Sequence, residues 1–441
     1  MERSKNLDAP SLGEATRFWL KLGFISFGGP AGQIAIMHEY LVEKKKWISD
    51  SRFLHALNYC MVLPGPEAQQ LATYLGWLLH GTKGGLIAGI LFILPSLLIL
   101  LALSMVYVSF GKIPWVESVF DGLKPAVIAI VLVALIKIGK KSLLSYFHYG
   151  VAIAAFGLIF FINIPFPLII LGAVVLSVLF QKLGWIPENG SEKSKSLNTD
   201  LENSYLINSF SPRKSPGEPL KTISQQIAVG LILWIIPIGL FLGFSQNFEF
   251  WKTLSLFFTQ AALVTFGGAY AVLPYVAQVS VEKYHWLDSF QMLDGLALGE
   301  TTPGPLIMVL VFVGFMAGYN SFDQSLLMGS LGLLTTAYFT FLPCFLFVLV
   351  GAPWIELTRE NKKLKSLLAI VTAAVVGVVL NLTIYLGKSV FFPIGKTSEP
   401  DFLAIGWTLI SFIVLYRLKV NMIVWIGASA LFGLMSYLFL G

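Results

Sequence analysis

Long apolar segments separated by short polar stretches run through most of this sequence. A helix that crosses the hydrocarbon core of a bilayer, about 30 Å thick, needs about 20 apolar residues. Segments of roughly that length in the first half occupy residues 16–40, 53–80, 85–110, 124–141, 148–163 and 166–182. Those in the second half occupy residues 226–244, 253–279, 290–318, 326–351, 366–387, 402–416 and 420–440. The pattern predicts an all-α, polytopic integral membrane protein with about 12–13 transmembrane segments.

A polar stretch from Lys182 to Lys221 divides the two halves. It is rich in Ser, Asn, Lys, Glu and Pro and holds few large apolar residues, which is typical of a flexible linker. We therefore expect a first repeat over residues 1–185, a linker over 186–224, and a second repeat with one joining helix over 225–441.

Two glycine- and proline-rich motifs of the first half recur in the second half at a constant shift of 239 residues. Phe27-Gly28-Gly29 aligns with Phe266-Gly267-Gly268, and Pro64-Gly65-Pro66 aligns with Pro303-Gly304-Pro305. Motifs that recur in the same order without a gap indicate an internal duplication. An odd joining helix between the copies would turn the second copy upside down, as in transporters with inverted repeats.

Composition agrees with a membrane protein and narrows the possible partners. The 441 residues are 56% hydrophobic and 12% charged, with a mean hydropathy of +0.77, whereas a soluble domain has about 25% charged residues. Net charge is +6, and an excess of Lys and Arg on cytoplasmic loops explains it. The lipid bilayer is thus the expected partner, and nucleic acid is not. The polar first dozen residues predict that no signal peptide is cleaved.

Charge gives a mixed prediction of topology. With the linker in the cytoplasm, the basic residues near Arg359 and Arg417 also lie inside, as the positive-inside rule favours. The same arrangement puts Lys44–Lys46 outside, against the rule. Either the first segment is re-entrant and the segment count is off by one, or this turn is basic for another reason.

Each Pro-Gly-Pro motif interrupts a predicted helix. Residues 53–63 before the first motif extend over only about half of the hydrocarbon core at about 1.5 Å per residue. Proline has no backbone N–H and glycine permits positive φ, so a continuous helix is not expected at residues 64–66. Open backbone at that depth is tolerated where it lines a wet cavity or is buried in protein.

The helix after each break offers a site for an anion. Pro66 suits the first helical position, so the free N–H groups of Glu67, Ala68 and Gln69 point into the gap. The Phe-Gly-Gly motifs would act in the same way, or would serve only close helix packing. A proline kink that serves only packing is likewise the alternative for the Pro-Gly-Pro motifs. The candidate substrate-binding residues are Gly28, Gly29, Pro30, Pro64, Gly65, Pro66, Gln69, Gln70, Gly267, Gly268, Thr301, Thr302, Pro303, Gly304 and Pro305.

Ionisable residues beside the breaks are candidates for a functional role because charge within a membrane is costly. Glu67 and Glu300 are the candidate proton-coupling residues. A carboxylate beside a bound anion is unfavourable unless it is protonated, so we expect a proton to be exchanged as the anion enters or leaves. Asp294, Glu39 and His55 also flank the breaks. Candidates that would attract an anion, or merely reach the interface, are Arg17, Lys21, His38 and Arg52.

At these motifs the chain resembles the chromate ion transporter family in its long, two-domain form. The matching text is FGGPAGQIAIMHEYLVEKKKWISDSRFLHAL and LPGPEAQQLATYLGWLLHGTKGGLIAGILFILPS in the first half, with FGGAYAVLPYV and GLALGETTPGPLIMVLVFVGFMAGY in the second. The resemblance covers both repeats. It implies a multi-pass inner-membrane protein that exports chromate from the cytoplasm, driven by a proton gradient or the membrane potential, and gives chromate resistance.

Other functions remain open at this stage. Sulfate has a similar shape and charge, so sulfate uptake is an alternative, and a channel is another. An intramembrane enzyme would need a metal cluster or a nucleophile with a base, and the spacing of His38, Glu39 and His55 matches no metal-ligand pattern. The chain has no phosphate-cradling loop and only two distant cysteines, Cys60 and Cys344. We therefore expect no enzyme, cofactor or metal; the oligomeric state is open, with a homodimer as one alternative.

Overall fold

The computed structural model describes residues 9–27, 29–183, 204–208, 220–244, 247–355, 362–393 and 399–440. Regular structure in these residues is helical, which confirms the all-α class. The helices of the first half are α1 (Leu12–Ile25), α2 (Gly29–His38), η1 (Glu39–Lys44), α3 (Asp50–Cys60), α4 (Glu67–Phe110), α5 (Pro114–Ser142), α6 (Tyr146–Ile162) and α7 (Phe166–Lys182). Those of the second half are α9 (Leu220–Phe244), α10 (Phe248–Leu263), α11 (Ala269–Gln278), η2 (Val279–Lys283), α12 (Ser289–Thr301), η3 (Leu306–Met308), α13 (Val309–Ser321), α14 (Leu326–Ile355), α15 (Lys362–Phe391), α16 (Phe402–Tyr416) and α17 (Met422–Leu440).

Six of the described helices are long and apolar enough to cross a membrane, and four more apolar helices are shorter. The six are formed by α4, α5, α9, α14, α15 and α17. This number differs from the 12–13 segments expected from apolar length. There are two reasons: several apolar segments are divided into two short helices, and α6, α7 and α16 are single helices of only 17, 17 and 15 residues.

The first such segment, residues 16–40, forms a hairpin of α1 and α2. The helix begins after Ser11, whose side chain caps the Glu14 amide, and it ends at Ile25 before the first glycine motif. Lys45, just after η1, lies 2.7 Å from the Glu14 carboxylate near the start of α1. The chain therefore returns to the end of the molecule from which it came.

A second hairpin joins α3 to the first arm of α4. The backbone at His80 (φ −133°) and Gly81 (φ 65°) is not helical, so α4 consists of two arms. His80 Nε2 lies 2.8 Å from the carbonyl of Pro10, so this bend lies beside the start of α1. The rings of Tyr59 and Tyr74 are 6.1 Å apart, whereas one straight helix would separate these residues by about 22 Å. Residues 53–80 thus fold back at the Pro-Gly-Pro motif and do not cross as one broken helix.

The same order of elements recurs in the second half, with α10, α11, η2, α12 and α13 around the second pair of motifs. Asn320, at the end of α13, donates a 2.8 Å hydrogen bond to the carbonyl of Trp286. The rings of Phe250 and Phe322 are 4.9 Å apart. The start of α10 and the end of α13 therefore lie together, as their first-half counterparts do.

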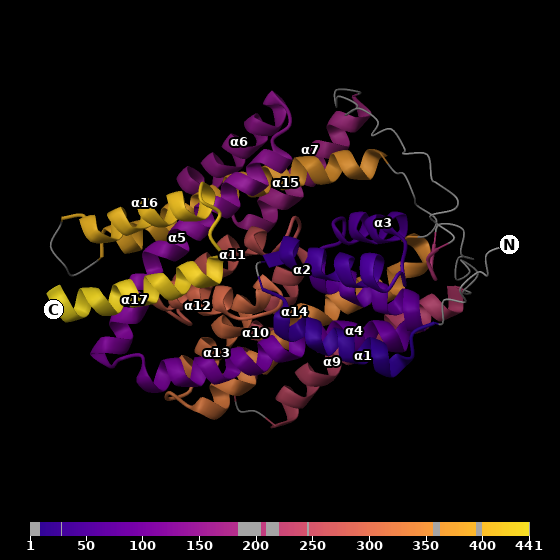
Figure 1. Cartoon of the computed structure of the whole chain (residues 1–441), viewed down its shortest axis with the longest axis horizontal. Coiled ribbons are helices and arrows are strands. Elements are labelled where there is room, and N and C mark those ends of the chain that lie inside the picture. The colour runs from indigo at the N-terminus through magenta and orange to yellow at the C-terminus, as the bar shows by residue number, and fades with distance from the viewer. Residues whose placement is uncertain are drawn as a thin grey trace.

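The two sets of hairpins open at opposite ends of the second arm of α4. Its start at Gly81 lies with the first-half hairpins. Its last turns, from Tyr107 to Phe110, lie beside Asp288–Gln291 at the start of α12. We name these the linker end and the cavity end. Figure 1 shows α1–α3 toward one end of the long axis and α17 at the other.

Residues 204–208, within the predicted linker, identify the linker end. Ile207 donates a 3.0 Å hydrogen bond to the carbonyl of Trp47 and accepts one of 2.8 Å from the amide of Ser49. The turn containing Lys44–Lys46 therefore lies on the same side as this part of the linker. This contact favours the re-entrant alternative and removes the charge conflict. The rest of the predicted linker lies outside the described residues, apart from the start of α9.

Helices of one half pack closely on helices of the other. α5 lies against α16 and α17, while α15 lies against α6 and α7. The contacts are close because small residues face each other. A Cβ on Gly122 would lie 2.5 Å from the amide nitrogen of Gly433, so these positions of α5 and α17 require glycine.

Candidate functional site

The four breaks contact one another in two pairs, and each pair joins the two halves of the chain. The amide of Gly65 donates a 2.7 Å hydrogen bond to the carbonyl of Thr265, and the amide of Gly304 donates one of 2.8 Å to Ser26. These two bonds are related by the shift of 239 residues, and each crosses from a Pro-Gly-Pro loop to the other half. We name residues 26, 27, 29, 64–66, 265–268 and 303–305 the break junction.

Backbone conformation explains the glycines of the Pro-Gly-Pro motifs. The φ angles are +128° at Gly65 and +98° at Gly304, a region that L-residues with a side chain rarely adopt. Space explains them too. A Cβ on Gly65 would lie 2.7 Å from the Cys344 sulfur, and one on Gly304 would overlap Ser96. Ser96 and Cys344 each follow the proline of a Leu-Pro pair in the opposite half.

The side chain of Gln33 in α2 bonds to both halves of the junction. Its Nε2 donates a 2.5 Å hydrogen bond to the Gly304 carbonyl and lies 3.3 Å from the Ser26 carbonyl. Gln33 is fully buried. The Ser96 hydroxyl donates to the neighbouring Pro303 carbonyl. Side chains of the first half thus fix the second Pro-Gly-Pro loop.

A helix begins at each of the four breaks of the junction. α2 begins at Gly29, α4 at Glu67, α11 at Ala269 and η3 at Leu306, each directly after a break. The first amide groups of a helix have no acceptor within it, and the helix dipole places partial positive charge there. Each of these ends therefore favours an anion. Pro66 precedes the helix as its N-cap residue and is not the first helical residue.

The predicted polar ligands beside the breaks have partners within the protein. The side-chain amide of Gln70 donates to the Pro64 carbonyl at 2.7 Å, and the side-chain amide of Gln69 donates to the Thr73 hydroxyl at 3.1 Å. The hydroxyls of Thr301 and Thr302 donate to carbonyls one turn earlier in α12. Pro30, Gly267, Gly268 and Pro305 belong to the breaks themselves; Gly28 lies outside the described residues.

The two candidate coupling carboxylates differ in environment. Glu300, 7% exposed, accepts a 2.7 Å hydrogen bond from the Tyr270 hydroxyl. It lies near the end of α12, three residues before Pro303. Glu67, at the start of α4, is partly exposed. Under the shift of 239 these positions align with Met61 and Leu306, so neither carboxylate has a counterpart in the other half.

The predicted charge-attracting residues do not gather at the junction. Arg17 and Lys21 are exposed on α1. His38 pairs at the linker end with Asp50, at 2.8 Å, and with Glu43, at 3.3 Å. Arg52 is buried in the first turns of α3. These four residues are spread along the first-half hairpins.

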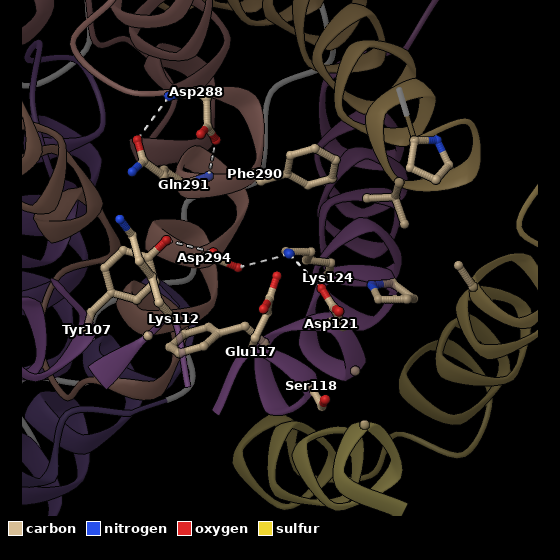
Figure 2. Close-up of a pocket in the computed structure, with 18 of the residues that line it drawn as sticks. Tyr107, Lys112, Glu117, Ser118, Asp121, Lys124, Asp288, Phe290, Gln291 and Asp294 are labelled. Atoms are coloured by element: carbon tan, nitrogen blue, oxygen red, sulfur yellow. Dashed lines mark hydrogen bonds and ion pairs between the residues drawn. The ribbon is translucent and has the colours of Figure 1, made fainter. Parts of the chain in front are cut away.

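A cavity of about 890 Å³ opens at the cavity end, between α4, α5, α12 and α17. Its lining contains a buried ion pair that the sequence reasoning did not propose (Figure 2). Lys124 Nζ lies 3.8 Å from Asp294 Oδ1 and 2.8 Å from Asp121 Oδ1. The Tyr107 hydroxyl donates a 2.8 Å hydrogen bond to Asp294 Oδ2. Asp294 was noted in the sequence as an acid near the second break, but Lys124, a single lysine in α5, was not among the candidate residues.

Broken apolar helices paired about a central anion-favouring junction are typical of a polytopic membrane transporter. The comparisons with known proteins define the family. The family model described as "Chromate transporter" matches residues 13–178 and again residues 252–434. The chain belongs to the chromate transporter family and is a multi-pass protein of the plasma membrane.

Curated relatives match over most of their length. A "Chromate transport protein" of Cupriavidus metallidurans is 30% identical over 97% of this chain and 94% of the relative. One from Pseudomonas aeruginosa is 31% identical over 94% and 90%. A "Probable chromate transport protein" of Synechococcus elongatus is 30% identical over 86% of each chain. No solved structure matches.

Proposed function

We propose that the protein is a secondary active transporter that exports chromate from the cytoplasm and thereby gives chromate resistance. The observation that carries the proposal is the break junction, where two crossed hydrogen bonds join four breaks and a helix begins at each break. A tetrahedral oxyanion dianion matches this arrangement because amide groups and helix dipoles bind it without a buried cation. Chromate is chosen over sulfate because three curated relatives carry chromate in their names.

The two halves are proposed to be inverted repeats. Their hairpins open at opposite ends, and the bonds of Gly65 and Gly304 are related by one sequence shift. In such folds the substrate site lies at the repeat interface, and alternating access comes from movement of one unit against the other. Release of one crossed hydrogen bond would open the junction toward one end only.

Export is supported by the distribution of charge. The linker end carries Lys44–Lys46, and the positive-inside rule assigns such turns to the cytoplasm. A basic face also raises the local concentration of a dianion. Coupling to protons is proposed through Glu300 and Glu67, which lie beside the junction, because a carboxylate next to a dianion is favourable only when protonated.

The test is uptake of radiolabelled chromate and sulfate by everted membrane vesicles energised by respiration, with and without the protein. Everted vesicles turn cellular export into uptake. Energy-dependent accumulation of chromate is the expected result, and Glu300→Gln and Glu67→Gln are expected to reduce it. Accumulation that is insensitive to collapse of the pH gradient would remove proton coupling. Sulfate leaving preloaded vesicles without chromate uptake would replace export with sulfate import.

A further inference from the structure

The lining of the 890 Å³ cavity is acidic, which makes it a poor path for a dianion. Two lysines, Lys112 and Lys124, face five carboxylates there. The carboxylates come from α5, from α12 and its N-cap, and from the N-cap of α16, and they are Glu117, Asp121, Asp288, Asp294 and Asp401. Unscreened like charge repels chromate and attracts cations. The cavity therefore has the charge of a cation-access route.

Asp294 is the most deeply buried of the five cavity carboxylates. It is 5% exposed, and its Oδ1 has no hydrogen-bond donor among the described residues. The cation nearest to that oxygen, Lys124, is 3.8 Å away and is held more closely by Asp121. A buried ion pair that serves only structure needs short, complete hydrogen bonds to offset desolvation. This pair leaves one carboxylate oxygen free to accept.

The position of Asp294 on α12 connects the cavity with the break junction. Asp288 caps α12 at the cavity mouth. Asp294 follows six residues later, and Glu300 lies six residues beyond that, about 9 Å further along the helix in each case. Glu300 lies beside the junction and is bound to Tyr270. One helix thus carries acidic groups from solvent to the proposed substrate site.

We propose that Asp294 is the acceptor through which the coupling proton enters from the cavity end, with Lys124 as its counter-ion in the deprotonated state. The inference rests on the proposed function and gives its coupling ion a route. A hydronium ion in the cavity gives up one proton and becomes water, and this proton forms an O–H bond at Asp294 Oδ1 and neutralises the carboxylate. Lys124 then keeps Asp121 as its partner at 2.8 Å. Tyr107 remains bound to Oδ2 in both states.

The charged groups that face Asp294 support this assignment. Tyr107 of α4 donates to it, and Lys124 of α5 is its cation. Asp121 and Asp288 share the cavity and add negative charge, which draws protons toward Asp294. Figure 2 shows Lys124 between Asp294 and Asp121.

The experiment uses the full chain in proteoliposomes with two readouts. A pH-sensitive dye reports proton movement driven by a chromate gradient, and exchange of labelled for unlabelled chromate reports the substrate path without net proton movement. The variants are Asp294→Asn, Asp294→Glu, and the double variant Asp294→Asn with Lys124→Gln, which also removes the charge of the counter-ion. Asp323→Asn is the matched control, because Asp323 is exposed near the same end and does not line the cavity.

We expect both Asp294→Asn proteins to lose chromate-driven proton movement, down to the level of empty vesicles, while chromate exchange persists. Asp294→Glu and Asp323→Asn are expected to retain both signals. The proposal is overturned if Asp294→Asn moves protons as the unmodified protein does, if exchange is also lost in the double variant, or if sodium replaces protons as the coupled ion. Absence of chromate exchange in the unmodified protein would instead refute the proposed function, and the inference with it.

Discussion

Substitution of Gly65 by alanine tests whether the break junction holds the two halves together. The φ angle of +128° costs a residue with a side chain about 1–2 kcal/mol. The new Cβ would also lie 2.7 Å from the Cys344 sulfur and 2.7 Å from Gln70 Nε2, and such overpacking costs about 1–3 kcal/mol. The backbone and steric costs together amount to about 2–5 kcal/mol of destabilisation.

Two other glycines separate these contributions. Gly29 has a φ of +72° but open space where its Cβ would point, so Gly29→Ala isolates the backbone cost of about 1–2 kcal/mol. Gly157, within α6, has open space and an ordinary helical backbone. Alanine there is expected to be neutral or to stabilise by up to about 1 kcal/mol.

The assay is the melting temperature of each purified protein in one detergent, read as the fraction that stays monodisperse after heating. The expected order of stability is Gly157→Ala, then Gly29→Ala, then Gly65→Ala. Adding Cys344→Ala to Gly65→Ala should recover part of the loss, because it removes one of the two clashing atoms. Equal melting of the Gly65 and Gly29 variants would refute the steric argument and the close approach of the two halves.

Two further outcomes follow from the junction and the hairpins. Gln33→Leu removes the donor to the buried Gly304 carbonyl and should cost about 1–3 kcal/mol; an unchanged melting temperature would contradict this. Lys46→Cys and Ser204→Cys should react with a membrane-impermeant maleimide added to one side of the membrane, and Asp323→Cys should react when it is added to the other side. The two natural cysteines are buried and give little background. Labelling of Lys46 and Asp323 from the same side would contradict the opposed hairpins.

The sequence predicted the breaks correctly because their cause is local. Proline removes backbone donors and glycine permits positive φ wherever they occur, and the structure has positive φ at Gly65, Gly267, Gly268 and Gly304. Fold-back at the breaks was not predictable from apolar length, since a hairpin of two short helices and one crossing helix hold similar numbers of apolar residues. For the bend within α4, the sequence contained one local indication, the single glycine Gly81 beside His80.

The partners across the junction were not predictable for a different reason. The crossed bonds join the backbone of Gly65 to that of Thr265, and the backbone of Gly304 to that of Ser26. Every residue has these backbone groups, so the order of side chains does not indicate which of them will pair. The one available signal was that Ser26 and Thr265 align under the shift of 239 residues. Lys124 was overlooked because its acid partner lies on α12, far away in the chain.

The backbone of the break junction is matched between the two halves, whereas the ionisable side chains near it are not. The two crossed hydrogen bonds of the junction join equivalent positions of the two halves, so the backbone contacts are the same for the linker end and the cavity end. The ionisable positions do not match: under the same shift Asp294 aligns with His55, and Glu300 with Met61. A site with equivalent halves has no intrinsic difference between inward and outward opening. Any coupling to a gradient across the membrane must therefore depend on the unmatched side chains, and α12 carries the carboxylates that could provide it.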